Sequence, residues 1–270
     1  MPILATDLDR TLFPNGKQPY DDSMAKLKEL IERHKMTLIY VTGRNEQQIR
    51  EGMSLYHPPL PSYAVTEVGT KVYQVDTANG EFIEELGYIE KIRLLTPTWD
   101  IDKIKEELSQ TRDLRLQEAH HQNDFKASFF IDNLSQARSV ISKVRQVIGR
   151  LCSDADVTYS VDEMIGIGLL DIMPSKANKM EGLEYLRQRK GLSKEEIIYA
   201  GDSGNDISAL TYGYRSILVA NAIDEVRQET KKVGESNGVI DKIYFAEGKD
   251  GLNGCYASGI IEGLEHFGFL

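Results

Sequence analysis

Two acidic segments of the chain each follow a short apolar run. Asp7 and Asp9 come directly after the first apolar run, and Asp202 and Asp206 come after the run at 197–200. An apolar run that stops at acidic residues is typical of a buried strand, and parallel sheets bind ligands at the carboxyl ends of their strands. Neighbouring carboxylates repel each other unless a cation joins them, and Mg²⁺ prefers hard oxygen ligands of this kind. Each segment alone could equally be a turn or a helix cap, but the pair predicts a shared magnesium site.

A hydroxyl and two lysines could contact a phosphate group near these acids. Thr42 and Gly43 end another apolar run, and a hydroxyl with backbone N–H groups at a helix start can bind phosphate. Lys176 and Lys179 lie at the start of a predicted helix at 179–189, although lysine is favoured in the last turn of a helix. A phosphate ligand would explain both features. A simple helix cap and solvated surface lysines are the competing interpretations.

Alternating apolar and helical patterns predict the sheet that would position these residues. Strands are expected at 3–6, 37–41 and 62–66, with helices at 24–34 and 45–56 between them. This order implies a parallel sheet with right-handed crossovers. The alternation resumes late in the chain, with strands expected at 168–172, 197–200 and 216–220 and helices at 179–189, from about 205, at 223–232 and at 259–267.

The middle of the chain has a different pattern. A hairpin of strands at 71–73 and 82–83 is expected around Asn79-Gly80. Helices are expected at 101–109 and 136–148, and strands at 126–131 and 157–161. The sequence therefore predicts an α/β fold with a Rossmann-like parallel-sheet core, formed by residues 1–82 and 162–270, and an inserted α+β cap domain at 83–161.

The composition argues against several classes of protein. The 270 residues carry a formal net charge of −10, which opposes nonspecific binding to nucleic acid. The sequence contains neither an apolar run of about 18 residues nor a signal-peptide pattern, so we expect no association with a membrane. Cys152 and Cys255 match no metal or redox spacing. The simplest expectation is a cytoplasmic protein that is monomeric or weakly oligomeric.

Four segments together carry a more specific pattern. They are Asp7-Leu8-Asp9-Arg10-Thr11-Leu12, Thr42-Gly43-Arg44, Lys179 and Gly201-Asp202-Ser203-Gly204-Asn205-Asp206. In order and in position at strand ends, they resemble the motifs of the haloacid dehalogenase superfamily of phosphatases. Less specific matches, such as Phe125-Lys126-Ala127-Ser128, resemble the sucrose-6-phosphate phosphatases of its sugar-phosphatase branch. The resemblance covers nearly the whole chain and implies magnesium-dependent hydrolysis of a sugar phosphate.

The resemblance also implies a role for each acidic residue. Asp7 would attack phosphorus and form an aspartyl-phosphate intermediate. Asp9 would protonate the departing sugar oxygen and later accept a proton from water, and a bound phosphate dianion should raise its pKa. Mg²⁺ would be bound by Asp7, by the backbone carbonyl of Asp9 and by Asp202, and Asp206 would support the metal directly or through water.

The remaining matched residues would bind the substrate. Thr42, the Gly43 N–H, Lys179 and Asn205 would contact phosphate oxygens, and Lys179 is preferred to Lys176 because its spacing from the preceding Asp-Ile-x-Pro run matches the family. An inserted cap would exclude water and select the sugar. Candidate substrate contacts are Gln47 and Gln48, just after the Thr42 loop, and four residues of the predicted cap, which could instead be exposed loop residues: His120, His121, Asn123 and Lys126.

Several alternatives to a sucrose-6-phosphate phosphatase remain open on the sequence. Relatives with the same core act on mannosylfructose phosphate and other sugar phosphates, so a related disaccharide-phosphate phosphatase or a broad hexose-phosphate phosphatase is an alternative. A phosphomutase would share the aspartyl-phosphate step but would have to retain a doubly phosphorylated intermediate. A non-catalytic sugar-phosphate-binding protein is the third class. The complete set of four acids, Asp7, Asp9, Asp202 and Asp206, argues against it.

Overall fold

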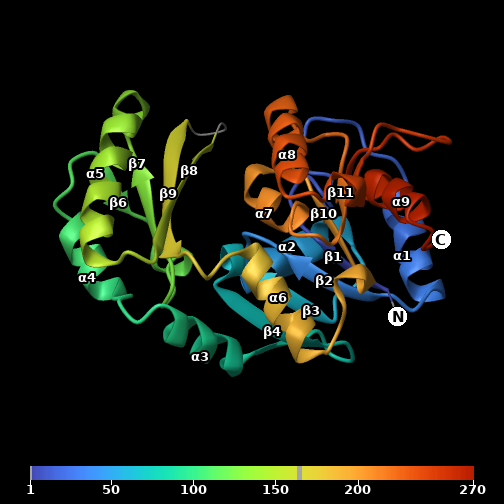
Figure 1. The fold of residues 1–270 in the computed structure, drawn as a ribbon, viewed down its shortest axis with the longest axis horizontal. Coiled ribbons are helices and arrows are strands. Elements are labelled where there is room, and N and C mark those ends of the chain that lie inside the picture. The colour runs from blue at the N-terminus through green and yellow to red at the C-terminus, as the bar shows by residue number, and fades with distance from the viewer. Residues whose placement is uncertain (1, 163–165) are drawn as a thin grey trace. The chain divides into compact units, whose positions relative to one another are not determined.

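The computed structural model describes residues 2–162 and 166–270, which divide into two compact units (Figure 1). The larger unit is formed by Met1–Glu85 and Lys179–Leu270, and the smaller unit by Leu86–Asn178. Each unit has its own sheet and its own apolar core. Among the described residues, every helix is too short or too polar to cross a lipid bilayer.

The larger unit is built on an eight-stranded sheet with the order β12-β11-β10-β1-β2-β3-β4-β5. Strands β12 to β3 run parallel, and β4 and β5 add an antiparallel hairpin at one edge. The predicted parallel sheet is therefore confirmed. The strands are β1 (Ile3–Thr6), β2 (Thr37–Val41), β3 (Tyr63–Thr66), β4 (Lys71–Asp76), β5 (Glu81–Glu84), β10 (Ile197–Gly201), β11 (Arg215–Leu218) and β12 (Ile243–Phe245).

The helices of the larger unit connect these strands. They are α1 (Ser23–Arg33), α2 (Glu46–Tyr56), α6 (Lys179–Arg189), α7 (Ile207–Leu210), α8 (Asp224–Ser236) and α9 (Tyr256–His266). Helix α2 begins at a capping box in which the side chains of Asn45 and Gln48 each accept a hydrogen bond from the other residue's N–H. Leu27 of α1 and Ile260 of α9 are fully buried in the main core, so these two helices cover the sheet together.

The smaller unit contains a four-stranded antiparallel sheet with the order β6-β7-β9-β8. Helices α4 and α5 pack on one face of this sheet, where Ile104, Val144 and Phe129 share one apolar core (Figure 1). The elements of the unit are α3 (Leu86–Leu95), α4 (Ile101–Leu108), β6 (Leu114–Leu116), β7 (Ala127–Ile131), α5 (Ala137–Leu151), β8 (Ala155–Asp162) and β9 (Ile167–Pro174).

The position of β9 corrects the predicted division of the chain. The sequence placed the strand at 168–172 in the core and the boundary at 161/162, but this boundary falls inside β8. Strand β9 pairs with β8 from Ala155↔Pro174 to Asp162↔Ile167, so both strands belong to the smaller unit. Burial along the first part of β9 alternates, as in a half-exposed antiparallel strand, and the larger unit resumes at Lys179.

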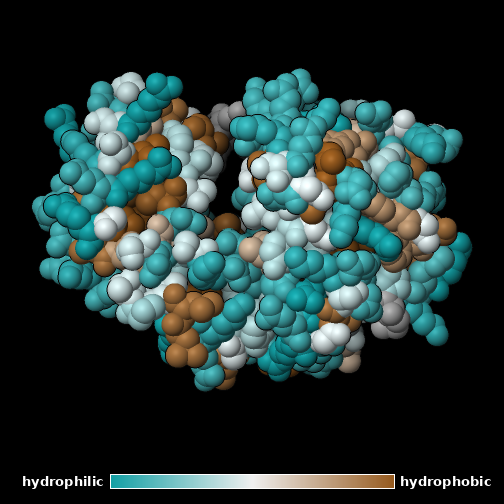
Figure 2. All heavy atoms as spheres, viewed as in Figure 1, coloured by the Kyte–Doolittle hydropathy of each residue, from teal (hydrophilic) through white to brown (hydrophobic). Residues whose placement is uncertain are grey.

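The surface in Figure 2 is mainly hydrophilic, in agreement with the acidic composition. An apolar patch lies over α3, the helix that sequence patterning did not predict. Leu86 and Leu94 of this helix are 66% and 82% exposed, whereas Tyr88 and Ile92 are fully buried. Helix α3 therefore packs through the face that carries Tyr88 and Ile92, whereas the leucines on its other face are exposed to solvent.

Candidate active site

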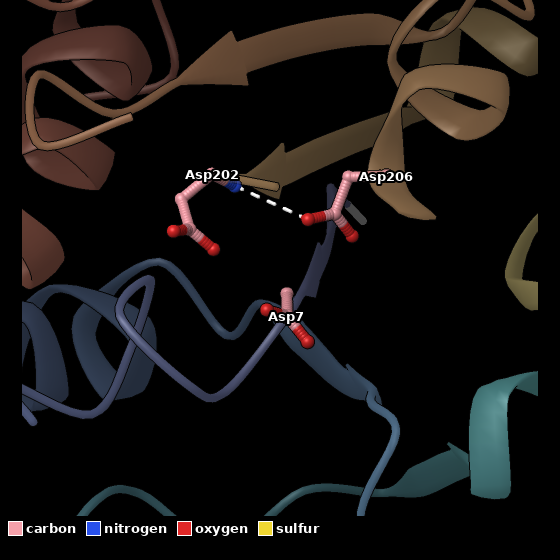
Figure 3. Close-up of side chains that lie close together, drawn as sticks. All are labelled: Asp7, Asp202 and Asp206. Atoms are coloured by element: carbon pink, nitrogen blue, oxygen red, sulfur yellow. Dashed lines mark hydrogen bonds between the residues drawn. The ribbon is translucent and has the colours of Figure 1, made fainter. Parts of the chain in front are cut away.

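Three acidic side chains from two neighbouring strands meet at one edge of the main sheet (Figure 3). Asp7 follows β1, and Asp202 and Asp206 follow β10, which pairs with β1 in parallel. One carboxylate oxygen of each residue lies within 4.8 Å of the others, and the three residues are at most 4% exposed. Leu8 is fully buried in the core directly after Asp7, which fixes the start of the loop.

Lys179 joins two of these carboxylates. It is the first residue of α6 and is 1% exposed, and its Nζ donates to Asp7 Oδ1 and to Asp206 Oδ1, each at 2.8 Å. Burial lowers the pKa of Lys179, but the carboxylates of Asp206 and Asp7 outweigh this effect and raise it above the ordinary value. Lys176 is an exposed residue of the smaller unit. The structure therefore brings Lys179 to the acidic residues.

The cluster holds more acidic than basic groups, because Lys179 pairs with both Asp7 and Asp206, and Asp202 has only the partly exposed Arg10 as a charged partner. Burial raises the pKa of Asp7 well above its ordinary value, and burial together with Asp206 raises the pKa of Asp202 to about 7. Asp202 Oδ2 is buried and accepts no hydrogen bond from the described residues, although Arg10 Nε lies 3.3 Å away. Three carboxylates offer only oxygen ligands here, and one of their oxygens accepts no hydrogen bond, so the cluster fits a hard divalent cation.

Asp206 is held by several donors. Its Oδ1 accepts from Tyr199 Oη at 2.6 Å as well as from Lys179, and its Oδ2 accepts from Ser203 Oγ at 2.9 Å. The backbone N–H groups of Asp202 and Ser203 also donate to Oδ2, at 3.2 and 3.0 Å. Burial raises the pKa of Asp206, but Lys179 and these donors outweigh burial and hold the pKa below its ordinary value. These bonds suit a residue that orients Lys179 and supports a metal through water.

Asp9 lies in a different environment from Asp7. Its carboxylate is 41% exposed and forms a two-point ion pair with Arg44, whose Nε and Nη2 donate at 2.9 and 2.7 Å. Asn15 Nδ2 donates to the same carboxylate at 2.6 Å. Partial burial raises the pKa of Asp9, but the Arg44 guanidinium and Asn15 outweigh it and hold the pKa below its ordinary value. Sequence reasoning quoted Arg44 within a motif and missed this contact.

The predicted phosphate-binding residues other than Lys179 lie after the ends of β2 and β10. Thr42 is fully buried, and its Oγ1 accepts from the Arg44 N–H at 3.2 Å. Gly43 is exposed. Asn205 is also exposed, and its Oδ1 accepts from Ser203 Oγ at 3.0 Å. The structure thus places Thr42 close to the loop that carries Arg44 but does not bring Asn205 into the buried cluster.

The two glutamines proposed as substrate contacts have partners within α2. Gln47 Nε2 donates to Glu51 at 3.0 Å, one turn further along the helix. Gln48 closes the capping box, because its Oε1 accepts from the Asn45 N–H at 3.0 Å and its own N–H donates to Asn45 at 2.9 Å. Both side chains therefore stabilise the helix that follows the Thr42 loop.

A polar cluster of His121, Lys126, Ser128 and Asp171 lies at the open side of the small sheet. Ser128 and Asp171 face each other across β7 and β9, and Ser128 Oγ donates to Asp171 Oδ1 at 2.5 Å. Lys126 is 6% exposed, and its ammonium forms no hydrogen bond or ion pair within the described part of the chain. Burial lowers the pKa of His121, and His120 and Lys126 lower it further. A lysine, an imidazole, a carboxylate and a hydroxyl gathered in one place are suited to bind a polar ligand.

The other two residues proposed from this region have simpler environments. His120 is exposed, and its ring contacts that of His121 at a centroid distance of 4.1 Å with the two planes tilted by 44°. Asn123 Oδ1 accepts from the Phe125 N–H at 2.7 Å, which closes a short turn directly before Lys126. Asn123 therefore shapes the turn that presents Lys126.

Comparison with known proteins identifies the family to which the chain is similar. The sequence matches the sucrose-6F-phosphate phosphohydrolase family over residues 1–268. It is 35% identical to a Nitrosococcus oceani protein described as a HAD-like hydrolase, over 98% of this chain and 71% of that protein. It is 27% identical to an Arabidopsis thaliana protein named "Probable sucrose-phosphatase 2", over 98% of this chain and 59% of that protein. The chain thus spans less than two thirds of the length of this plant relative.

A solved structure shows the same fold. The sucrose-phosphatase of Synechocystis sp. PCC6803, in complex with sucrose and phosphate, superposes with a TM-score of 0.75. The match covers 98% of this chain and 97% of that chain at 23% sequence identity. The parallel-sheet unit and the separate antiparallel unit are therefore both features of a known architecture.

Proposed function

The chain belongs to the sucrose-6F-phosphate phosphohydrolase family of haloacid dehalogenase phosphatases, and we propose that it hydrolyses sucrose-6-phosphate to sucrose and inorganic phosphate. The observation that carries this proposal is the buried cluster around Asp7. A carboxylate nucleophile lies beside the Lys179 ammonium, and the neighbouring Asp202 keeps an oxygen without a hydrogen bond. This arrangement supports attack on a phosphate ester together with a divalent cation.

In the proposed first step, a carboxylate oxygen of Asp7 forms a bond to phosphorus. The bond between phosphorus and the sugar oxygen breaks, and that oxygen takes a proton from Asp9. In the second step water attacks phosphorus, Asp9 accepts a proton from the water, and the bond to Asp7 breaks. Bound Mg²⁺, held by Asp7, Asp202 and the Asp9 carbonyl, would supply positive charge that lets an anionic nucleophile approach an anionic phosphate.

Lys179 contributes the second positive charge. Its ammonium has three N–H donors, of which two contact Asp7 and Asp206. A third donor is available for an equatorial phosphate oxygen, where negative charge is spread during phosphoryl transfer. Thr42 and the Gly43 N–H, at the end of β2, would contact other phosphate oxygens.

We propose that the smaller unit is the cap that selects the sugar. Its polar cluster offers an ammonium at Lys126, an imidazole at His121 and a carboxylate at Asp171, which suit the many hydroxyl groups of a disaccharide. The turn closed by Asn123 presents Lys126 to this cluster. Hydroxyl recognition by buried polar groups is selective, because an analogue that lacks a hydroxyl leaves such a group unpaired.

The decisive experiment is phosphate release with Mg²⁺ from a panel of esters. Sucrose-6-phosphate would be compared with mannosylfructose phosphate, trehalose-6-phosphate and simple hexose phosphates. We expect the highest kcat/KM with sucrose-6-phosphate. A flat profile would reject the disaccharide assignment and leave the chemistry intact, whereas formation of a phosphate isomer without phosphate release would indicate a mutase.

Matched variants test the residues. Asp7→Asn should abolish turnover, while Asp241→Asn, the same change at an exposed residue, should leave it unchanged. Undiminished turnover in Asp7→Asn would reject the mechanism. Lys179→Ala should lose most activity and Lys176→Ala very little, and the reverse result would reassign the phosphate-binding lysine.

A further inference from the structure

Asn221 connects three segments that are far apart in the sequence. It follows β11 and is 4% exposed, and its Nδ2 donates to the carbonyl of Arg10 at 2.6 Å. Its Oδ1 accepts from the Tyr256 N–H at 3.0 Å, and its own carbonyl accepts from Arg10 Nη2 at 3.3 Å. One buried amide therefore holds the loop after β1, the turn after β11 and the start of α9.

The two residues that contact the Asn221 side chain have unusual backbone conformations. Arg10 has φ +59° and Tyr256 has φ +52°, in the left-handed region that residues other than glycine seldom adopt. Such conformations persist where surrounding contacts enforce them, and they concentrate at functional sites. Asn221 supplies such a contact to the main chain of both residues.

The conformation of Arg10 controls two groups of the candidate site. Its N–H donates to Asn15 Oδ1 at 2.7 Å, and Asn15 Nδ2 donates in turn to Asp9 at 2.6 Å. Its side chain places Nε 3.3 Å from Asp202 Oδ2. A change in the main chain at Arg10 would therefore move Asp9 as well as the guanidinium beside Asp202.

We propose that Asn221 is a positioning residue, which holds the main chain of Arg10 so that Asp9 can protonate the departing sugar oxygen. The inference rests on the proposed function. An amide is suited to this place because it donates to one backbone group and accepts from another at the same time. An ionised aspartate would keep only the bond from the Tyr256 N–H, and alanine would keep neither bond.

The test compares two phosphate esters whose leaving groups differ in whether they need a proton from a general acid in order to depart. The sugar oxygen of sucrose-6-phosphate needs a proton to depart, whereas the nitrophenolate of p-nitrophenyl phosphate is a weak base and leaves without one. The value of kcat/KM reports the steps up to this departure, so the later hydrolysis of the intermediate does not affect it. General acid catalysis contributes about 10²–10⁴-fold, so its partial loss is measurable.

We expect Asn221→Asp and Asn221→Ala to lower kcat/KM for sucrose-6-phosphate at least about tenfold more than for p-nitrophenyl phosphate. Asn237→Asp is the matched control. Asn237 Nδ2 donates to the Thr211 carbonyl at 3.1 Å, so the same substitution removes the same kind of bond elsewhere in the larger unit. This control should leave kcat/KM for both esters unchanged.

Every other outcome of this experiment would count against the positioning role of Asn221. Equal losses on the two esters, or no loss, would overturn the positioning role. Failure of both Asn221 variants to fold, with Asn237→Asp folded, would show that Asn221 acts in folding and would also overturn it. A folded wild-type chain inactive on both esters would overturn the proposed function, and the inference with it.

Discussion

Replacing Lys179 by methionine tests the electrostatic account of the site most directly. Methionine has nearly the same length and is apolar, so it fills the space without the charge. Asp7 and Asp206 would then lose the ammonium that lies 2.8 Å from each of them, at positions that are 4% and 0% exposed. Removing one partner of a buried ion pair costs about 3–5 kcal/mol, because the other charge stays buried without compensation.

This cost corresponds to a large change in thermal stability. For a domain of 150–250 residues, 1 kcal/mol shifts Tm by about 2–4 °C, so we expect Lys179→Met to lower Tm by roughly 10 °C. Urea unfolding followed by circular dichroism, with EDTA present, would measure the free energy. Lys232→Met is the control, because Lys232 is 77% exposed and its pairing with Glu229 at 3.4 Å contributes at most about 0.5 kcal/mol.

A double variant separates the ion pair from packing. In Lys179→Met/Asp206→Asn one of the two uncompensated carboxylates is gone, so the double variant should lose less stability than the two single variants added together. A single Lys179→Met variant within about 1 kcal/mol of the wild type would refute the reasoning. Strict additivity of the two substitutions would refute it as well.

Three further predictions follow from buried groups of the larger unit. Glu184 is 4% exposed, and although burial raises its pKa, bonds from Arg187, Tyr214 and Gln188 lower it overall. Because folding lowers the pKa of Glu184, the wild type should be more stable than Glu184→Gln by a full margin above about pH 4.5, and this margin should vanish as pH falls through the pKa of the folded state. Urea unfolding midpoints across pH 3–7 would measure the margin. A margin that grows in acid would contradict the reasoning. A Cβ at Gly201 would lie 2.6 Å from Asp206 Cγ, so Gly201→Ala should cost about 1–3 kcal/mol of stability and lower turnover. A Cβ at Gly149 would meet open space, so Gly149→Ala should leave turnover unchanged and be neutral or stabilising. Urea unfolding would measure stability, and phosphate release would measure turnover. Mg²⁺ should stabilise the folded protein by about 2.7 kcal/mol at 100 times its Kd, which would be measured as a rise in Tm. Asp202→Asn should remove most of this rise. An equal rise in both proteins would place the ion elsewhere.

The main sheet could be predicted because its strands carry strong local signals. The apolar runs at β1, β2 and β10 each stop at a polar motif, and parallel strands bring such ends to one edge. The convergence of Asp7 with Asp202 therefore follows from topology alone. Helix position alone could not choose between Lys176 and Lys179, which are three residues apart, and only the family spacing favoured Lys179. The choice depends on where α6 begins and which unit each lysine joins.

Strand β9 was misassigned because its local sequence is ambiguous. The apolar run at 168–172 suits a buried parallel strand and an antiparallel strand with one covered face equally well. Its pairing with β8 is a long-range property, which sequence periodicity does not carry. Helix α3 was missed for a related reason, since apolar side chains on its exposed face hide the helical periodicity of Tyr88 and Ile92.

The state of Asp9 shows why chemistry at the site depends on contacts that no motif encodes. A general acid must carry a proton, yet the Arg44 ion pair and Asn15 hold the pKa of Asp9 below its ordinary value. A phosphate dianion bound beside Asp7 would add negative charge near Asp9 and compete for the Arg44 guanidinium, and both effects raise the pKa of Asp9. If Asp9 is the proposed general acid, its protonation would be coupled to the presence of substrate, because the charge of the bound phosphate would favour the protonated form of Asp9.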